Sequence, residues 1–361
     1  MSIPATLVPR TAHGVDSPAG FETESIPRNA KWSFITRNVS VSDASHIEYR
    51  SSHRPRPGDL VMASVDKIAQ HTRIQLSNSR RSLLYPGDKV ILAYGNRYAP
   101  DQFEAVLPGT LDRCHLVAAG GIAAKAVAKH SRLKWPTTVR PEGYCIDTNG
   151  EVMNLRDYRL ETPGFAETQG KPVIAVLGTS MNSGKTTTAA ALVKGLSSAG
   201  LNVAAVKATG TGSGNDVWSY ADAGAARTLD FTDAGYASTY KIPQAEIEAC
   251  FECLVAVSLA DDGVDVTVVE IADGLLHSET SDLVASASFR RLVKHVVFAA
   301  GEAMGAVAGV EWLARHGIKP VAISGLLTAS GLAVKEAQVY TRTRVLTKAM
   351  LESPKIMDLV L

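Results

Sequence analysis

The sequence predicts an α/β protein with a doubly wound, mostly parallel sheet, preceded by a β-rich N-terminal domain. Three observations predict this fold. A glycine-rich segment at residues 178–188 lies between a continuous apolar run and a helix-length segment. After it, apolar runs alternate with helix-length segments, which is typical of parallel strands joined by crossover helices. Before about residue 165, the apolar residues come in short runs separated by turn residues, which is typical of a β-rich module.

The composition limits the class of protein. At 361 residues, of which 45% are apolar, the chain is long enough for about two globular domains. The formal net charge of +1 gives no field that would attract nucleic acid or an anionic membrane, so neither is expected as a partner. The 4 cysteines are too few for a disulfide scaffold, and no stretch has the apolar character of a membrane span or of a secretory signal. We therefore expect a cytoplasmic protein.

Three regions are expected along the chain. Residues 1–30 mix proline, glycine and hydroxyl residues without periodicity, which predicts a flexible tail. Residues 31–165 form the β-rich N-terminal domain, whose short apolar runs are compatible with a barrel. Residues 161–171 are rich in proline, glycine and polar side chains and are expected to be the linker. Residues 166–361 then form the α/β domain.

Within the N-terminal domain, the alanine-rich residues 116–128 predict a helix, and residues 145–153 predict a hairpin that turns on Asn149-Gly150. Residues 94–103 are dense in aromatic and polar side chains, which suits a binding loop, but their Gly-Asn and Pro-Asp pairs favour a structural turn. Basic residues near Arg80 and over 125–134 are compatible with a surface that binds nucleic acid or with a solvent-exposed helix face. The balanced overall charge favours the solvated face.

In the α/β domain, five strands and five helices are expected. The strands are residues 173–177, 201–207, 264–270, 295–299 and 319–326. The helices are residues 185–198, 216–226, 244–258, 281–294 and 301–315. Ligands of such sheets bind beyond the carboxyl ends of the strands, so the residues after each strand are candidates for chemistry.

Residues 178–188 have the chemistry of a phosphate-binding loop. Backbone N–H groups and the positive end of the following helix favour a bound phosphate, Lys185 adds a compact charge, and the hydroxyl of Thr186 can ligate Mg²⁺. Strand, glycine loop and helix together indicate a P-loop NTPase domain. Five residues separate Gly178 from Gly184, one more than in the common motif. The predicted nucleotide-binding residues are Gly178, Thr179, Asn182, Ser183, Gly184, Lys185, Thr186 and Thr187, with Lys185 also predicted to be catalytic.

The segment after the second expected strand begins with Lys207 and has glycines at 210, 212 and 214, which would let the backbone approach a ligand closely. We predict that Lys207 is catalytic and that the hydroxyls of Thr209, Thr211 and Ser213 bind substrate. A plain flexible loop is the alternative interpretation.

Acidic residues follow the third expected strand. Glu270 comes directly after a buried run, where phosphate-loop proteins place a second acidic ligand of the metal ion, and Asp273 lies behind it. His277 is predicted to bind substrate, with a plain loop histidine as the alternative. Cys250 and Cys253 have a metal-like spacing, but no second pair accompanies them, so they are expected to be core cysteines.

These segments resemble dethiobiotin synthetases, which belong with the cobyric-acid and MobB-type branch of P-loop NTPases. The resemblance covers residues 172–330 and rests on the loop spacing, on Lys207-Ala208-Thr209-Gly210, on residues 269–274 and on Tyr220-Ala221-Asp222-Ala223. It departs where Ala208 replaces a proline and where Ile271 and Asp273 replace small residues. The N-terminal domain has no counterpart there, and uncharacterised proteins of the DUF1611 type share this two-domain architecture.

The resemblance implies roles for individual residues. Lys185 would contact the β- and γ-phosphates of ATP, and Thr186, Asp222 and Glu270 would hold Mg²⁺, although Asp216 is an alternative to Asp222. Lys207 would lie at the reacting end of a small substrate. Family members phosphorylate a carboxylate or carbamate, and a homodimer is implied by the same analogy.

Two functions from different classes therefore follow. The first is an ATP- and Mg²⁺-dependent phosphoryl-transfer enzyme, a kinase or the first half of a ligase, acting on a small carboxylate-bearing metabolite. The second is a nucleotide-hydrolysing accessory protein that regulates or loads a partner enzyme through the N-terminal domain. No Asn-Lys-any-Asp guanine signature occurs in the chain, which favours ATP.

Overall fold

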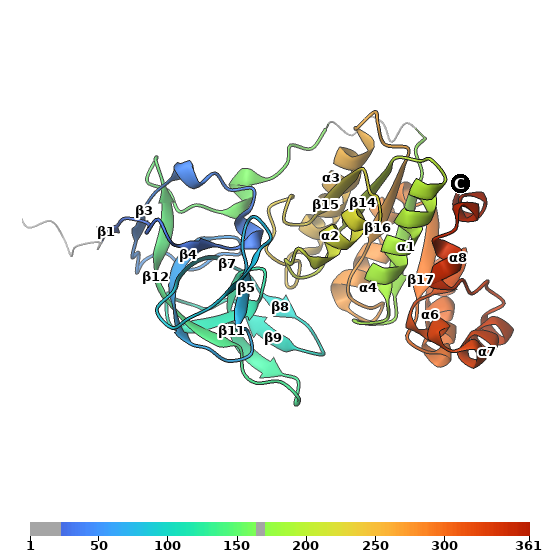
Figure 1. Ribbon diagram of the computed structural model, residues 1–361, viewed down its shortest axis with the longest axis horizontal. Coiled ribbons are helices and arrows are strands. Elements are labelled where there is room, and N and C mark those ends of the chain that lie inside the picture. Colours follow the sequence, from blue (N-terminus) through green and yellow to red (C-terminus); the bar gives the residue numbers. More distant parts are fainter. Residues whose placement is uncertain (1–22, 164–169) are drawn as a thin grey trace, which may run out of the picture.

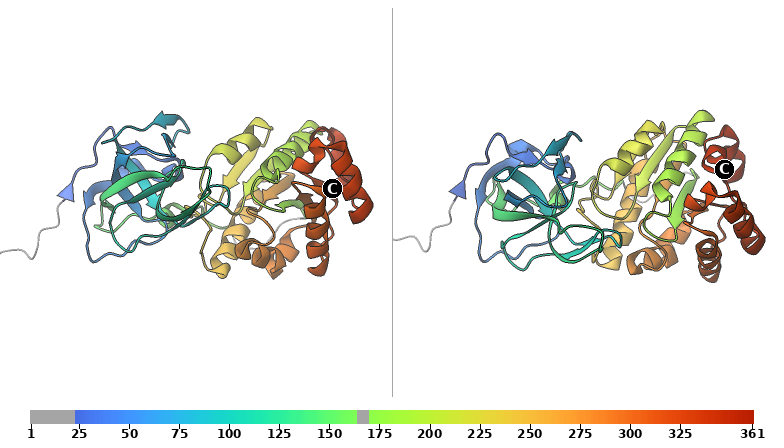
Figure 2. Two further views of the ribbon diagram at one scale, coloured as in Figure 1. Left: turned by 90° about the horizontal axis from the view of Figure 1, so that it is seen from below. Right: turned by 60° about the horizontal axis from the view of Figure 1, so that its bottom comes forward.

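The computed structural model describes residues 23–163 and 170–361, and in every view they form two domains that lie side by side (Figures 1 and 2). Most of the expected tail, residues 1–30, lies outside the described residues. Its described end contains strand β1 (Thr23–Glu24), which pairs with β3 (Ala44–Glu48). Part of the expected linker also lies outside them.

The N-terminal domain is built on a 10-stranded sheet, part of which closes into a barrel. In that barrel β12 pairs with β4, β4 with β7, β7 with β11, β11 with β10, and β10 with β12 again. Only the β7–β11 pairing in this ring is parallel. The sheet consists of β1, β2 (Lys31–Trp32), β3, β4 (Leu60–Lys67), β7 (Lys89–Tyr94), β8 (Arg97–Tyr98), β9 (Phe103–Val106), β10 (Cys114–Ala118), β11 (Ile122–Lys129) and β12 (Thr137–Asp147), beside a hairpin of β5 (Arg73–Gln75) and β6 (Arg81–Leu83).

The expectation of a helix at residues 116–128 was wrong, because these residues form the end of β10 and most of β11. Gly121 has a φ of +114°, which a helix does not allow and which reverses the chain between the two strands. Side chains of β11 then alternate between the two faces of the sheet, so pairing and burial outweigh the helix preference of alanine. The hairpin expected on Asn149-Gly150 is present, with Ile146 paired to Val152.

The C-terminal domain is an α/β sandwich around a six-stranded parallel sheet, in the order β15-β14-β16-β13-β17-β18. The strands are β13 (Val173–Gly178), β14 (Val203–Lys207), β15 (Arg227–Asp230), β16 (Val266–Glu270), β17 (His295–Ala299) and β18 (Ala322–Ser324). β15 was not expected from the sequence, because this edge strand has only four residues and only one of them, Leu229, is apolar.

Helices cover both faces of this sheet because side chains of each strand alternate between them. Ile174 and Val176 of β13 pack with helix α1, whereas Val173, Ala175 and Leu177 pack with α3 to α6. The helices are α1 (Lys185–Ser198), α2 (Asn215–Asp222), α3 (Gln244–Leu259), α4 (Ser278–Ala285), α5 (Ala287–Leu292), α6 (Ala303–Arg315), α7 (Gly331–Thr341), α8 (Lys348–Leu351) and α9 (Met357–Val360). In the described part of the chain, no helix is long and apolar enough to cross a membrane.

Two expected helices differ in their bounds. The helix expected over 216–226 ends at Asp222, shortly before Gly224, whose φ is +99°. The helix expected over 281–294 is two helices, because Ser286 has extended backbone angles and its hydroxyl accepts a hydrogen bond from the N–H of Phe289, which caps α5.

The two domains share buried apolar packing. Val217 of α2 and Ala237 of the α/β domain belong to the same buried cluster as Phe34 and Ile35 of the N-terminal domain. Polar contacts add to it, among them the Arg37 guanidinium, which lies 3.1 Å from Asp230 Oδ1 and 2.7 Å from Asp233 Oδ1. The N-terminal domain is therefore held against the α/β domain at a fixed place.

Candidate functional site

The phosphate loop lies between β13 and α1, at the centre of the parallel sheet. Gly178 ends β13, and a Cβ there would lie 2.4 Å from Ser183 Oγ and 2.7 Å from Lys185 Cγ, so only glycine fits. Gly184 precedes α1 with a φ of +98°, and no side chain caps the helix. The N–H groups of the first turn of α1 therefore remain available for an anion, together with the positive end of the helix dipole.

Lys185 is the first residue of α1, and its side chain is buried in the loop. Its Nζ donates a hydrogen bond to the carbonyl oxygen of Ser180, 2.8 Å away. Burial lowers the pKa of Lys185, and the nearby Lys207 lowers it further against the opposing pull of Glu270, Asp273 and Asp216. A bound phosphate would relieve the cost of burying this charge.

Carboxylates and a second lysine converge beside the loop. Lys207 and Glu270 are register partners at the carboxyl ends of β14 and β16. Lys207 Nζ forms an ion pair with Asp216 and lies 3.7 Å from Glu270 Oε1. Burial would lower the pKa of Lys207, but Glu270 and Asp216 together raise it. Lys207 is therefore a firmly protonated charge in this cluster.

Thr186 joins the loop to the same cluster. Its Oγ1 lies 3.2 Å from Asp216 Oδ1 and 3.2 Å from Glu270 Oε1. The hydroxyl of Tyr220 donates to Glu270 Oε2, which fixes that carboxylate, and burial followed by the charge of Glu270 raises the pKa of Tyr220. One hydroxyl and two carboxylates thus offer hard oxygen ligands at one place, which suits Mg²⁺.

Asp222 does not take part in this cluster. It is the last residue of α2 and is exposed, whereas Asp216 lies in the first turn of the same helix. The helix begins directly after the loop at the end of β14, so only its first turn reaches Thr186 and Lys207. The structure thus places Asp216, the alternative left open by the sequence, beside Thr186 and Lys207, and it places the predicted metal ligand Asp222 away from them.

The predicted substrate-binding residues separate into two groups. Thr211 and Ser213 line the large cleft described below. Thr209 is buried, and its hydroxyl donates to the carbonyl oxygen of Ala272 at 2.5 Å, so it links two loops. His277 lines a small pocket that adjoins this cleft, where its ring contacts Tyr98 and its Nδ1 is 3.0 Å from Glu279 Oε2.

The glycines after Lys207 serve packing between the domains. A Cβ at Gly212 would lie 2.5 Å from Cγ2 of Ile35, and one at Gly214 would lie 2.5 Å from Nε2 of Gln75. The N–H of Gly214 donates to Gln75 Oε1 at 3.0 Å. The close approach expected from these glycines thus occurs at Gly212 and Gly214, but toward the N-terminal domain.

A cleft of about 950 Å³ lies between the two domains. One wall is the phosphate loop with Lys207, Asp216, Glu270 and Asp273. The other wall comes from the N-terminal domain and consists of Gln70, His71, Arg97, Tyr98, Ala99, Asp101, Gln102, Ala118, Ala119 and Leu133. The loop over residues 94–103 therefore lies opposite the phosphate loop, and the side-chain amide of Asn182 donates to Asp101.

Three largely buried titratable residues line this cleft, of which the sequence marked Asp273 only as a second choice and did not mark Arg97 or His71. Burial raises the pKa of Asp273 against the opposing charge of Lys185. Burial lowers the pKa of Arg97 to about 10 and, with the charge of Arg97, that of His71 to about 4. The aromatic and polar density of residues 94–103 was the signal that could have identified Arg97.

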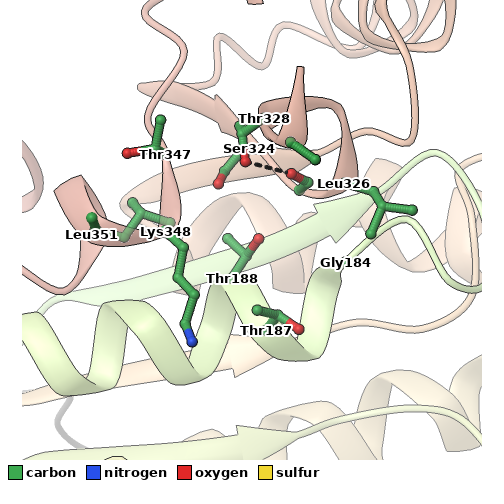
Figure 3. A pocket seen from close by; sticks show the side chains of 12 residues that line it. Gly184, Thr187, Thr188, Ser324, Leu326, Thr328, Thr347, Lys348 and Leu351 are labelled. Atoms are coloured by element: carbon green, nitrogen blue, oxygen red, sulfur yellow. Dashed lines mark hydrogen bonds between the residues drawn. The ribbon is translucent and has the colours of Figure 1, made fainter. Parts of the chain in front are cut away.

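A second pocket of about 350 Å³ lies beside the start of α1 (Figure 3). Thr187 and Thr188 of α1 line it together with Ser324 at the end of β18, with Thr328, and with Thr347 and Lys348. It shares Gly184, Thr187 and Leu326 with the interdomain cleft. An elongated ligand could therefore extend from this pocket, over Gly184, to Lys185.

The comparison with protein families agrees with this geometry. Residues 173–275 match the family model of MobB, molybdopterin guanine dinucleotide synthesis protein B. The C-terminal domain is a P-loop NTPase domain. Such domains bind a nucleotide, generally with Mg²⁺. No curated protein matches the chain.

A search of solved structures matches a protein of the signal recognition particle and a signal recognition particle receptor. The 54 kDa protein of Aeropyrum pernix in complex with GDP is 22% identical, with a TM-score of 0.35, over 55% of this chain and 47% of that chain. The receptor FtsY of Elizabethkingia anophelis is 18% identical, with a TM-score of 0.35, over 48% of this chain and 56% of that chain. Its complex with GDP is 17% identical, with a TM-score of 0.35, over 53% and 60%. The chain thus spans about half the length of these structures.

Proposed function

We propose that this protein transfers the terminal phosphoryl group of ATP, with Mg²⁺, to a small carboxylate-bearing substrate in the interdomain cleft. The observation that carries this proposal is the position of Lys207. This buried, protonated side chain lies on the cleft wall beside the phosphate loop, where charge develops during phosphoryl transfer. A nucleotide switch would need no second lysine facing a cleft of small-molecule size.

The nucleotide would occupy both pockets. Its base and ribose would lie in the pocket between α1 and the residues after β18, and its phosphates would pass Gly184 to reach Lys185. The residues that line the base pocket include no aspartate or glutamate, whereas guanine presents N–H donors that a carboxylate accepts well. This favours ATP. The name of MobB refers to a guanine dinucleotide, so GTP is the comparison to test.

Thr186, Asp216 and Glu270 would hold the metal ion. Among the described residues, no group of three or more His, Cys, Asp or Glu could hold a metal alone. Mg²⁺ bound by one or two carboxylates, a hydroxyl and phosphate oxygens fits this arrangement. The ion would neutralise charge on the phosphates, and Tyr220 would keep Glu270 oriented.

For the phosphoryl transfer itself, the protein would position the two substrates and stabilise negative charge. A carboxylate oxygen of the substrate attacks the γ-phosphorus, and the bond from that phosphorus to the β–γ bridging oxygen breaks, which gives an acyl phosphate and ADP. Lys185 and Lys207 lie where they stabilise the negative charge of the transferred group. The spacing of the loop and the segments around Lys207 and Glu270 support the dethiobiotin synthetase-like branch for this chemistry.

A second candidate function is that of a nucleotide-hydrolysing accessory protein. The hydrogen bond from Asn182 in the phosphate loop to Asp101 in the N-terminal domain favours it, because the state of the loop would then affect the other domain. This function requires a partner protein that stimulates hydrolysis, with no phosphorylated small product.

The decisive experiment measures the release of ADP from ATP, or of GDP from GTP, across a panel of carboxylates, with hydroxylamine present to trap an acyl phosphate as a hydroxamate. We expect one carboxylate to stimulate ATP turnover and to give a hydroxamate. Lys185→Ala should lower this turnover by about 100-fold or more. If no carboxylate raises the rate of nucleotide turnover and no hydroxamate forms, phosphoryl transfer is refuted and the accessory function remains.

A further inference from the structure

Arg97 of β8 is a buried cation with unsatisfied hydrogen bonds. Its side chain lines the interdomain cleft, and the residue is only 6% exposed. Nη2 donates to Gln102 Oε1 at 2.7 Å, but Nε and Nη1 have no hydrogen-bond partner within the described residues. The guanidinium also lies 5.7 Å from the centre of the Phe103 ring, which holds it in place.

An arrangement of this kind is costly in the free protein. A buried guanidinium normally forms an ion pair or a complete set of hydrogen bonds. In the parts of the chain that the structure covers, no carboxylate lies within ion-pair distance of Arg97. Burial lowers its pKa to about 10, so it remains charged at neutral pH, and Asp273 across the cleft only partly offsets the effect of burial. An anion that enters the cleft would supply the missing partner.

The neighbours of Arg97 fit an anion as well. His71, with a pKa near 4, is neutral at pH 7, and its buried Nδ1 also has no hydrogen-bond partner among the described residues. Gln70 and Gln102 add uncharged amides to the same wall. The carboxylate of Asp101 is engaged by Asn182 in the phosphate loop. Arg97 is thus the cation of this wall, among neutral polar groups.

We propose that Arg97 anchors a carboxylate of the acceptor substrate, distinct from the group that is phosphorylated, so that the acceptor is a small dicarboxylate. This inference rests on the proposed phosphoryl transfer. The reacting oxygen must lie beside Lys185 and Lys207 on one wall, whereas Arg97 lies on the other wall. The planar guanidinium matches a carboxylate in geometry and forms strong charge-assisted hydrogen bonds. The N-terminal domain therefore selects the substrate.

The test uses the full chain saturated with Mg²⁺ and the non-hydrolysable nucleotide AMP-PNP. Succinate, glutarate and adipate are titrated calorimetrically, with their diamides as uncharged controls. We expect at least one dicarboxylate to bind and its diamide not to bind. Arg97→Gln should weaken dicarboxylate binding by about tenfold or more, and Arg97→Lys by a smaller factor, because lysine keeps the charge without the fork. Arg113→Gln, which removes an exposed arginine of the same domain, should change nothing.

The affinity for AMP-PNP shows whether Arg97 binds the substrate carboxylate or the phosphates of the nucleotide. If Arg97 binds the substrate, Arg97→Gln and Arg97→Lys leave the affinity for AMP-PNP unchanged within about twofold. An equal loss of nucleotide affinity would overturn the proposal and assign Arg97 to the phosphates. Failure of every dicarboxylate to bind the wild type, or unchanged dicarboxylate binding in Arg97→Lys, would also overturn it, even if Arg97→Gln did not fold.

The binding titrations and the turnover assay together distinguish this inference from the proposed function. Arg97-dependent dicarboxylate binding without carboxylate-stimulated ATP turnover would keep the anchor and refute phosphoryl transfer. Carboxylate-stimulated turnover that is indifferent to Arg97 would keep phosphoryl transfer and refute the anchor.

Discussion

At the scale of single residues, Lys207 holds the site together before any ligand binds. Asp216 and Glu270 would repel each other in this buried place, and Lys207 lies between them. Thr186 contacts both carboxylates, so a metal ion at their oxygens would share the role that Lys207 has alone in the free protein. The buried carboxylates and lysine are therefore arranged so that a metal cation and a phosphate can bind together without leaving a buried charge unpaired.

Asp216 and Asp222 provide a matched pair of variants for the metal site. We expect Asp216→Asn to raise the Mg²⁺ concentration needed for half-maximal ATP turnover by about tenfold or more, because a ligand oxygen loses its charge. Asp222→Asn removes one carboxylate from the same helix at an exposed position and should leave the Mg²⁺ titration unchanged. Equal effects of the two substitutions would contradict the assignment.

His71 makes stability depend on pH in a defined direction. Its pKa is about 4 in the folded protein, against about 6.5 when unfolded, so the unfolded chain binds more protons between these values. The stability it contributes above pH 6.5 is lost as the pH falls toward 4, by about 3 kcal/mol. Urea unfolding of His71→Asn should show a shallower decline over this range than the wild type. His130→Asn serves as the control, and parallel profiles for wild type and His71→Asn would disprove the prediction.

At the scale of elements, the loop from β14 to α2 joins the two domains to the site. Lys207 begins this loop at the phosphate side, and Gly212 and Gly214 pass close to Ile35 and Gln75 of the N-terminal domain. Asp216 then follows in the first turn of α2. One loop of the α/β domain therefore sets both the position of the charged cluster and the fit of the other domain.

Gly212→Ala tests this close approach. The added Cβ would lie 2.5 Å from Cγ2 of Ile35 and 2.9 Å from the carbonyl oxygen of Ala237, so a backbone must shift. We expect a loss of about 1–3 kcal/mol in the free energy of unfolding, which denaturant titration measures. Gly331→Ala, where nothing lies within 4 Å of the added Cβ, should change stability by less than about 0.5 kcal/mol. A Gly212→Ala variant as stable as Gly331→Ala would rule out the packing seen here.

At the scale of the whole molecule, the domains are joined by a buried ion pair as well as by apolar packing. The Arg37 guanidinium bridges Asp230 and Asp233, and burial would lower the pKa of Arg37 if the two carboxylates did not raise it. Asp230 is nearly inaccessible to solvent, at 1% exposed. The contact therefore depends on all three charges being present.

Arg37→Met leaves Asp230 and Asp233 buried without a cation. We expect it to lower the free energy of unfolding by about 3–5 kcal/mol, because removing one partner of a buried pair leaves an uncompensated charge. Arg113→Met, which breaks an exposed pair with Asp66, should cost at most about 1 kcal/mol. The comparison is made by thermal unfolding followed by circular dichroism, and similar losses in both variants would show that the interface does not depend on Arg37.

Much of the α/β domain is readable in the sequence because its elements are local. The phosphate loop, the start and end of α1 and the bounds of β17 coincide with the apolar and glycine pattern. The short edge strand β15 and the strands at residues 114–129 were missed, because their pairing partners are distant in the chain and their own side chains do not mark them.

By itself the sequence determined the P-loop NTPase domain and marked Lys185, Thr186 and Glu270 as candidate site residues, because each follows a recognisable strand or begins a recognisable helix. Only the tertiary structure distinguishes Asp216 from Asp222, since both lie on α2 and only Asp216 contacts Thr186 and Lys207. The tertiary structure alone places Arg97 in the cleft. Residue 97 and the phosphate loop are some eighty positions apart, and folding of the barrel against the sheet is what makes them two walls of one site.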